Sequence, residues 1–199
     1  MTFESWSTRK QRLSEDCNLQ MEGKEYVDEL EGQYDLDDGI DYYVDLIQDF
    51  SDDKDFILYF IETFPNLFYD QPHVINNISP RLKDDFEFML QMAKQDNYLY
   101  FHYASDRIRE DPQTMLEASS QDVRLATTCT PDLKRNEEFM LQLLQIDGMC
   151  IRLASDNLLD DKEFMSNAVK IYPKAYHFAS QRLLDDKDFM VLDPRTNIK

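Results

Sequence analysis

The chain has 199 residues, of which 42% are apolar, and its net charge is -19. Thirteen phenylalanines and eleven tyrosines exclude a disordered chain, because so many large apolar side chains require a core. The excess of negative charge disfavours direct binding of nucleic acid or of an anionic membrane surface.

Cellular location is indicated by the apolar runs and the cysteines. The first residues lack a signal peptide, and no run of about 18 apolar residues could span a membrane. The cysteines, Cys17, Cys129 and Cys150, are odd in number and widely spaced, which predicts reduced thiols. We therefore expect a cytoplasmic protein, or one delivered into the cytoplasm of a host or target cell.

Residues 1–52 are expected to form an acidic N-terminal helical segment. Between residues 22 and 55, fourteen acids face only Lys24 and Lys54, a net charge of -12. Apolar residues at helical spacing predict an amphipathic helix over about 39–50, docked through its apolar side onto the rest of the chain. Its acidic side, with the preceding acids, is a candidate partner-binding patch, which consists of Asp37, Asp38, Asp41, Asp45 and Asp49.

Residues 53–199 carry a repeated motif. Asp161-Lys162-Glu163-Phe164-Met165 recurs 25 residues later from Asp186 and is anticipated 25 residues earlier from Asn136. The same register marks units that begin near residues 53, 85, 111, 136 and 161, with a partial unit at 186. A fixed period of this size is typical of stacked helical units, so we predict an all-α, solenoid-like repeat array.

Each unit is predicted to contain one capped helix, a turn, a second short helix and a capped turn. In the best copy Asp161 is the expected N-cap, and Phe164 and Met165 begin a buried stripe. The second helix is anchored on a small apolar residue, followed in every copy by a hydroxyl that we expect to cap the turn into the next unit. The hydroxyl residues are Ser79, Ser105, Thr130, Ser155 and Ser180.

The first unit is longer than the others by seven residues, somewhere between Thr63 and Ile78. Insertions in solenoids often bulge from one face and touch ligands. Phe68 and Tyr69 in this insertion are therefore candidate partner contacts. The alternative, that the insertion packs against the N-terminal helix, is the simpler interpretation.

The motif Asp-Lys-Asp/Glu-Phe-Met, with Ala-Ser and a leucine three residues further on, resembles a short bacterial helical repeat known as domain of unknown function 4116. The resemblance extends from about residue 53 to 192 and is strongest between Asn136 and Met190. Pro112 and Thr114 depart from the motif. The resemblance implies a repeat architecture, and it implies no activity and no catalytic residue.

Catalytic and metal sites are not predicted. His102 and His177 occupy one position in units three repeats apart, so we expect roughly 25 to 30 Å between them, too far to share a metal ion. Cys129 and Cys150 fall at buried positions of the repeat, where they act as small apolar residues. The acids from Asp35 fail the calcium-loop pattern, because Gly39 is fifth rather than sixth. We expect no enzyme activity, cofactor or metal.

A row of polar residues two positions before each anchor is expected to face solvent. The row comprises His102, Thr127, Arg152 and His177, and His102, Arg152 and His177 complete the candidate partner contacts. The favoured function is a non-enzymatic scaffold for protein–protein interaction. The alternative is an acidic inhibitor, immunity or nucleic-acid-mimic protein that blocks a basic partner surface. The sequence fixes no oligomeric state.

Overall fold

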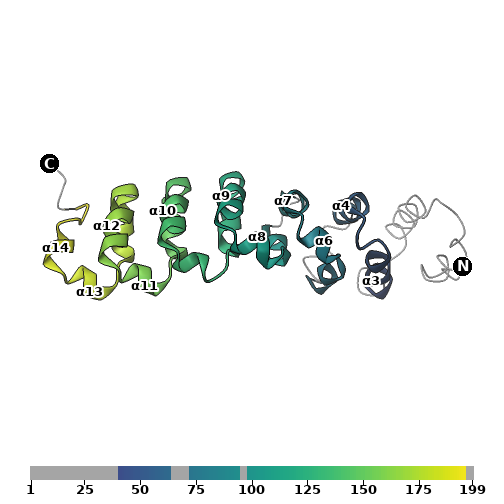
Figure 1. The fold of residues 1–199 in the computed structure, drawn as a ribbon, viewed down its shortest axis with the longest axis horizontal. Helices are drawn as coiled ribbons and strands as arrows, with labels where there is room; N and C mark the ends of the chain where they lie inside the picture. The colour runs from purple at the N-terminus through teal and green to yellow at the C-terminus, as the bar shows by residue number, and fades with distance from the viewer. Residues whose placement is uncertain (1–39, 64–71, 95–97, 196–199) are drawn as a thin grey trace, which may run out of the picture. The chain divides into compact units, whose positions relative to one another are not determined.

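The computed structural model describes residues 40–63, 72–94 and 98–195. Every regular element in these ranges is an α-helix or a 3₁₀ helix, which confirms the all-α prediction (Figure 1). The chain divides into two compact units between Ser105 and Asp106. The predicted boundary near residue 52 stays a prediction.

The first unit consists of short helices in the order that the repeat predicts. Its elements are α3 (Ile40–Asp49), α4 (Lys54–Thr63), η1 (Pro72–Asn77), α6 (Pro80–Lys83), α7 (Phe86–Lys94) and η2 (Tyr98–Tyr103), where η denotes a 3₁₀ helix. Helix α3 matches the amphipathic helix predicted over 39–50. Leu46 and Ile47 of α3 are fully buried, and the ring of Phe50 stacks on Phe56 of α4 with 4.2 Å between centroids. The predicted docking of the acidic helix onto the repeats is confirmed at these residues.

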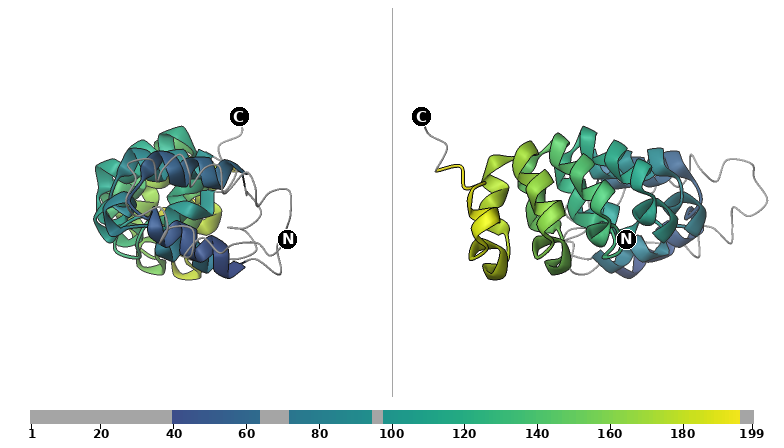
Figure 2. Two further views of the ribbon diagram at one scale, coloured as in Figure 1. Left: turned by 90° about the vertical axis from the view of Figure 1, so that its right-hand side faces the viewer. Right: turned by 60° about the vertical axis from the view of Figure 1, so that its left-hand side comes forward.

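The second unit repeats one pattern three times and ends with a shorter copy. Its elements are α8 (Asp106–Glu110), α9 (Pro112–Gln121), η3 (Val123–Thr128), η4 (Leu133–Arg135), α10 (Glu137–Ile146), η5 (Gly148–Leu153), α11 (Asp156–Leu159), α12 (Lys162–Ile171), η6 (Pro173–Phe178), α13 (Gln181–Leu184) and α14 (Lys187–Met190). Helices α9, α10 and α12 stand side by side in chain order, and α10 packs on both others (Figures 1 and 2).

A side-chain oxygen caps the first helix of every copy. Asp161 accepts a hydrogen bond from the backbone N–H of Phe164 at 2.9 Å, as predicted. In the other copies the backbone N–H of the third helical residue donates in the same way to the side chain that precedes the helix. The accepting side chains belong to Asp53, Asp85, Asp111, Asn136 and Asp186. These caps satisfy helix N–H groups that would otherwise lack partners, and so they fix where each helix begins.

The core is a ladder of equivalent apolar residues. Phe139, Phe164 and Phe189 are at most 1% exposed, and the anchors Cys129, Ala154 and Ala179 are also buried. The second helix of each unit is a six-residue 3₁₀ helix, a detail that the sequence did not specify. One position departs from the ladder, because Thr114 replaces phenylalanine and is half-buried.

The hydroxyl residue after each anchor bonds to the preceding repeat, a role that the sequence did not predict. In all five copies its backbone N–H donates to a carbonyl at the end of the previous short turn; for Ser180 this is Leu159 O at 2.9 Å. In three copies the side-chain hydroxyl also donates to the aspartate after that carbonyl. We call this second contact the hydroxyl–carboxylate clamp; its pairs are Ser79 with Asp52, Ser105 with Asp84 and Ser180 with Asp160.

The clamp is absent at two junctions within the second unit. There Glu110 and Arg135 occupy the aspartate position, and Thr130 Oγ1 and Ser155 Oγ are buried without a hydrogen-bond partner among the described residues. The prediction that every hydroxyl caps the following turn is therefore wrong at these positions. It holds at Ser79 and Ser180, whose hydroxyls accept from the N–H three residues later. The clamp thus forms where this position holds aspartate, and it is absent where the position holds glutamate or arginine.

We expect Asp160→Ala to lower the thermal unfolding midpoint, because it removes the carboxylate that accepts from the Ser180 hydroxyl and from Arg182 Nε. The converse change, Arg135→Asp with Asn157→Arg, supplies the missing clamp partners and should raise the midpoint. Calorimetry of both variants against the wild-type protein tests this. An unchanged midpoint for Asp160→Ala would show that the clamp contributes nothing to stability.

The last copy ends in a tight turn. Helix α14 has only four residues, and Pro194, three residues after its C-cap Val191, cannot belong to a longer helix interior. Asp193 is 8% exposed and accepts from the Arg195 backbone N–H at 2.9 Å and from its guanidinium at 2.6 Å. The side-chain bond from Arg195, followed by the backbone bond, lowers the pKa of Asp193 to about 2.

This pKa predicts a loss of stability in acid. An unfolded aspartate has a pKa of about 3.9, so the Asp193 carboxylate stabilises the fold above that pH and loses its contribution as the pH falls towards about 2. The difference in unfolding free energy between wild type and Asp193→Asn should be constant near neutral pH and shrink in acid. Asp156→Asn, at an exposed aspartate, serves as the charge-matched control; the same pH dependence in that variant would contradict the assignment.

Candidate functional site

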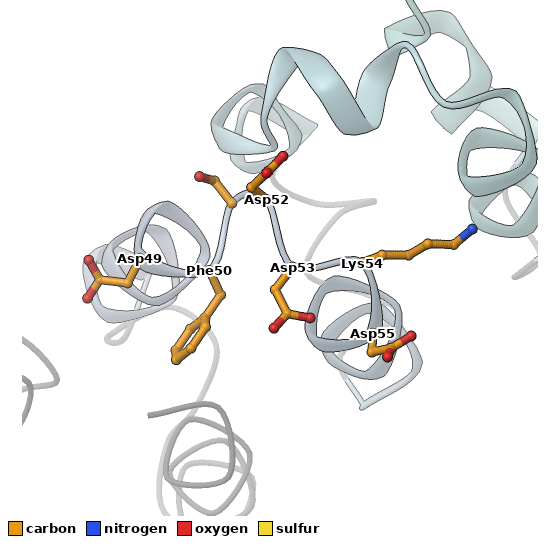
Figure 3. A pocket seen from close by; sticks show the side chains of 7 residues that line it. Asp49, Phe50, Asp52, Asp53, Lys54 and Asp55 are labelled. Carbon is orange, nitrogen blue, oxygen red and sulfur yellow. The ribbon is translucent and has the colours of Figure 1, made fainter. Parts of the chain in front are cut away.

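The loop between α3 and α4 surrounds an open pocket of about 480 Å³ lined by Phe50, Ser51, Lys54 and four aspartates. The aspartates are Asp49, Asp52, Asp53 and Asp55 (Figure 3). The pocket is acidic, since Lys54 is the one base beside its four aspartates, and it lies at the end of α3. Its carboxylates are therefore candidates for binding a ligand together.

Structural contacts already occupy part of this pocket. Asp52 accepts from Arg81 Nε at 2.7 Å and from the Ser79 hydroxyl, and these bonds, Arg81 first, lower the pKa of Asp52. Asp53 is the N-cap of α4. The labelled carboxylates point in different directions from the loop (Figure 3). Within the described ranges no group of three or more His, Cys, Asp or Glu side chains could hold a metal ion.

Little of the predicted acidic patch can be placed. Asp37 and Asp38 lie outside the described residues. Asp41 and Asp45 lie within α3, but the structure does not describe their side chains. Asp49 is half-buried at the end of α3 and lines the pocket. Whether these acids act as one patch stays a prediction.

The two candidate contacts in the insertion of the first unit cannot be placed either. Phe68 and Tyr69 lie outside the described residues, so their proposed contact with a partner stays a prediction. The described part of the first unit resumes with η1, in which Val74 and Ile75 are buried.

The predicted polar row is exposed where the structure describes it. In the first unit His102 of η2 is exposed. In the second unit Thr127, Arg152 and His177 occupy the same position of η3, η5 and η6, and all three are exposed. Because η5 packs on η6, the last two residues come from neighbouring elements.

Arg152 is held by an aromatic ring from the next repeat. Its guanidinium carbon lies 5.7 Å from the ring centroid of Phe178, the last residue of η6. A cation–π contact of this kind contributes about 0.5 to 1 kcal/mol at an exposed site. Sequence reasoning missed Phe178, although the spacing of 26 residues, one more than the repeat, places it beside the row position.

Exposed apolar side chains on the second unit were also missed. Ile146 and Ile171, the last residues of the packed helices α10 and α12, are 39% and 36% exposed. Met149 is 39% exposed, and its sulfur accepts a hydrogen bond from the Tyr172 hydroxyl at 3.2 Å. The equal position of the two isoleucines in successive units was the signal available in the sequence.

The described cysteines are buried, as predicted. Burial raises the pKa of the Cys150 thiol to about 11 and also raises that of Cys129. Thiols with raised pKa values are poor nucleophiles near neutral pH. Cys17 lies outside the described residues.

Among the described helices, none combines the length and the apolar character needed to cross a bilayer.

Comparison with known proteins identifies the repeat. No curated protein and no solved structure matches the sequence significantly. One family profile does match, at residues 53–102, 136–184 and 161–192, which together cover more than half of the chain and include the copies with the best motif. The chain therefore belongs to the family described as Domain of unknown function (DUF4116).

Proposed function

We propose that the chain is a non-enzymatic, cytoplasmic scaffold that binds another protein through the exposed row of its 3₁₀ helices. The observation that carries the proposal is the equivalent exposure of Thr127, Arg152 and His177 on successive repeats. Stacked repeats commonly use such positions to build an extended binding surface. The proposal covers the cytoplasm of the producing cell and that of a host or target cell into which the protein is delivered.

The chemistry of the repeat supports this assignment. The polar groups that successive repeats bring together serve as caps and clamps, such as the Asp160 carboxylate that holds Ser180 and Arg182. The side chains of Thr127 and His177 make contacts within their own 3₁₀ helices, with Arg124 and Tyr176, and among the described residues neither forms a cap or clamp of this kind between repeats. Their side chains can therefore differ between copies without loss of the fold, which suits a recognition surface.

The test is a binding comparison between two double variants. Arg152→Gln with His177→Gln alters the row, whereas Lys170→Gln with Lys187→Gln alters exposed lysines of α12 and α14, outside the 3₁₀ helices, and is the control. A partner isolated by affinity capture and identified by mass spectrometry should bind wild type and control equally, and the row variant at least about tenfold more weakly. Equal binding of all three proteins would contradict the proposal.

A second candidate is an acidic inhibitor that competes for a basic surface. The observation that favours it is the open pocket at the α3–α4 loop, which is lined by the half-buried Asp49 and the exposed Asp55 of the acidic segment. Salt separates the two functions, because Coulomb attraction between exposed charges is screened over about 10 Å at 0.1 M salt. Affinity that falls steeply between low and moderate salt, and falls again when the acids are neutralised, would favour the inhibitor.

A further inference from the structure

The charge of Arg152 is unusual in this acidic chain. Each of several other arginines forms an ion pair with an aspartate; they are Arg81, Arg109, Arg124, Arg135, Arg182 and Arg195. Arg152 is exposed and forms no ion pair with a carboxylate of the described residues. With 40 acids against 21 bases in the sequence, an arginine left without a carboxylate is the exception.

The surroundings of Arg152 hold its guanidinium in place without neutralising it. Phe178 covers one face of the group at 5.7 Å. A guanidinium stacked on a ring keeps the N–H donors at its edges, which can bind a carboxylate with two parallel hydrogen bonds. Because the stack restricts the side chain before binding, less conformational entropy is lost when a ligand arrives.

The neighbouring row positions add no negative charge. Thr127 is neutral, and its carbonyl accepts a hydrogen bond from the ammonium group of Lys134 at 3.4 Å. His177 packs its ring edge-on against Tyr176 with 5.6 Å between centroids. The nearby Asp193 is paired with Arg195. The row is thus neutral to basic on a chain whose total charge is strongly negative.

We propose that Arg152 binds a carboxylate of the protein partner, either an Asp or Glu side chain or a terminal carboxylate, with Phe178 as the positioning residue. This inference rests on the proposed function and specifies the chemistry of its partner. A nucleic acid is a poor fit, because a polyanion would be repelled by the net charge of -19 even where one guanidinium attracts it.

The binding can be followed at Arg152 itself, through the Nε–Hε resonances of the arginines in a nuclear magnetic resonance titration of the full chain. The probe is the blocked peptide Gly-Ser-Glu-Ser-Gly, and the matched control peptide carries Gln in place of Glu. We expect a saturable shift of the Arg152 resonance with the Glu peptide, little shift with the Gln peptide, and little shift of Arg124, which is already paired with Asp122.

Three variants complete the test. Arg152→Gln should abolish the saturable shifts of backbone resonances around the row, and Arg152→Lys, which keeps the charge without the planar fork, should weaken binding several-fold. Phe178→Leu should weaken it as well while the unfolding midpoint stays near that of wild type. Equal shifts with both peptides, unchanged binding by Arg152→Gln, or tighter binding of a thymidine hexanucleotide would overturn the proposal.

The two proposals can fail separately. If Arg152→Gln abolishes capture of the partner but the Glu peptide produces no saturable shift, the row is a binding surface and the carboxylate assignment is wrong. If the Glu peptide binds at Arg152 but the row variant still captures the partner, the carboxylate site is real and the scaffold function is located elsewhere.

Discussion

Phe164→Ala is expected to destabilise the protein by about 3 to 5 kcal/mol, the usual cost of removing a buried phenylalanine side chain and leaving a cavity. Phe164 is fully buried at the first turn of α12, which packs on both α10 and η6. The loss therefore reaches two repeats. Equilibrium denaturation in urea, followed by circular dichroism, measures it.

The matched controls come from the repeat. Phe139→Ala removes the equivalent ring one unit earlier and should cost a similar amount, whereas Ile171→Ala, at a residue 36% exposed, should cost much less. A difference under about 1 kcal/mol for Phe164→Ala would mean that the phenylalanine ladder is not the core of the stack.

Gly148→Ala is expected to destabilise the protein by about 1 to 3 kcal/mol, through overpacking between two repeats. A Cβ atom at Gly148 would lie 2.3 Å from Cγ and 2.8 Å from Cβ of Tyr172. These atoms are close to the backbone of Tyr172, so the ring cannot simply swing away. Its hydroxyl is also bonded to Met149. Chemical denaturation measures the effect.

A double-mutant cycle isolates the cause. In a Tyr172→Ala background the clash is gone, and Gly148→Ala should then be neutral or stabilising by about 0.4 to 1 kcal/mol, because alanine reduces the freedom of the unfolded chain. If Gly148→Ala costs the same in both backgrounds, the contact with Tyr172 is not the reason why glycine occupies this position.

Much of the fold could be predicted because it depends on local chemistry. The Asp-x-x-Phe spacing places a carboxylate one turn before a buried ring, which predicted both the cap at Asp161 and the burial of Phe164. Helix α3 was predicted because its apolar residues recur at helical spacing. The 3₁₀ character of η1, η2, η3, η5 and η6 was not predicted, since six residues are too few to distinguish a period of 3.0 from one of 3.6.

Contacts between repeats were harder to predict than the helices within each repeat. The hydroxyl of Ser180 was expected to cap the helical turn that follows it, and it does. It also donates a hydrogen bond to Asp160, 20 residues earlier, which was not predicted. The row position of Arg152 followed from the repeat, but its contact with Phe178 depends on how far two 3₁₀ helices are offset. Such pairs arise from the packing geometry, which the motif alone does not contain.

The most direct test of the central claim is affinity capture from a bacterial lysate with three proteins side by side: the wild type, the variant Arg152→Gln with His177→Gln, and a variant with Asn at Asp37, Asp38, Asp41, Asp45 and Asp49. The bound proteins are identified and quantified by mass spectrometry. We predict one stoichiometric partner that is retained by the five-asparagine variant and lost by the row variant. Loss of the partner from the five-asparagine variant, with retention by the row variant, would contradict the scaffold function and favour an acidic inhibitor.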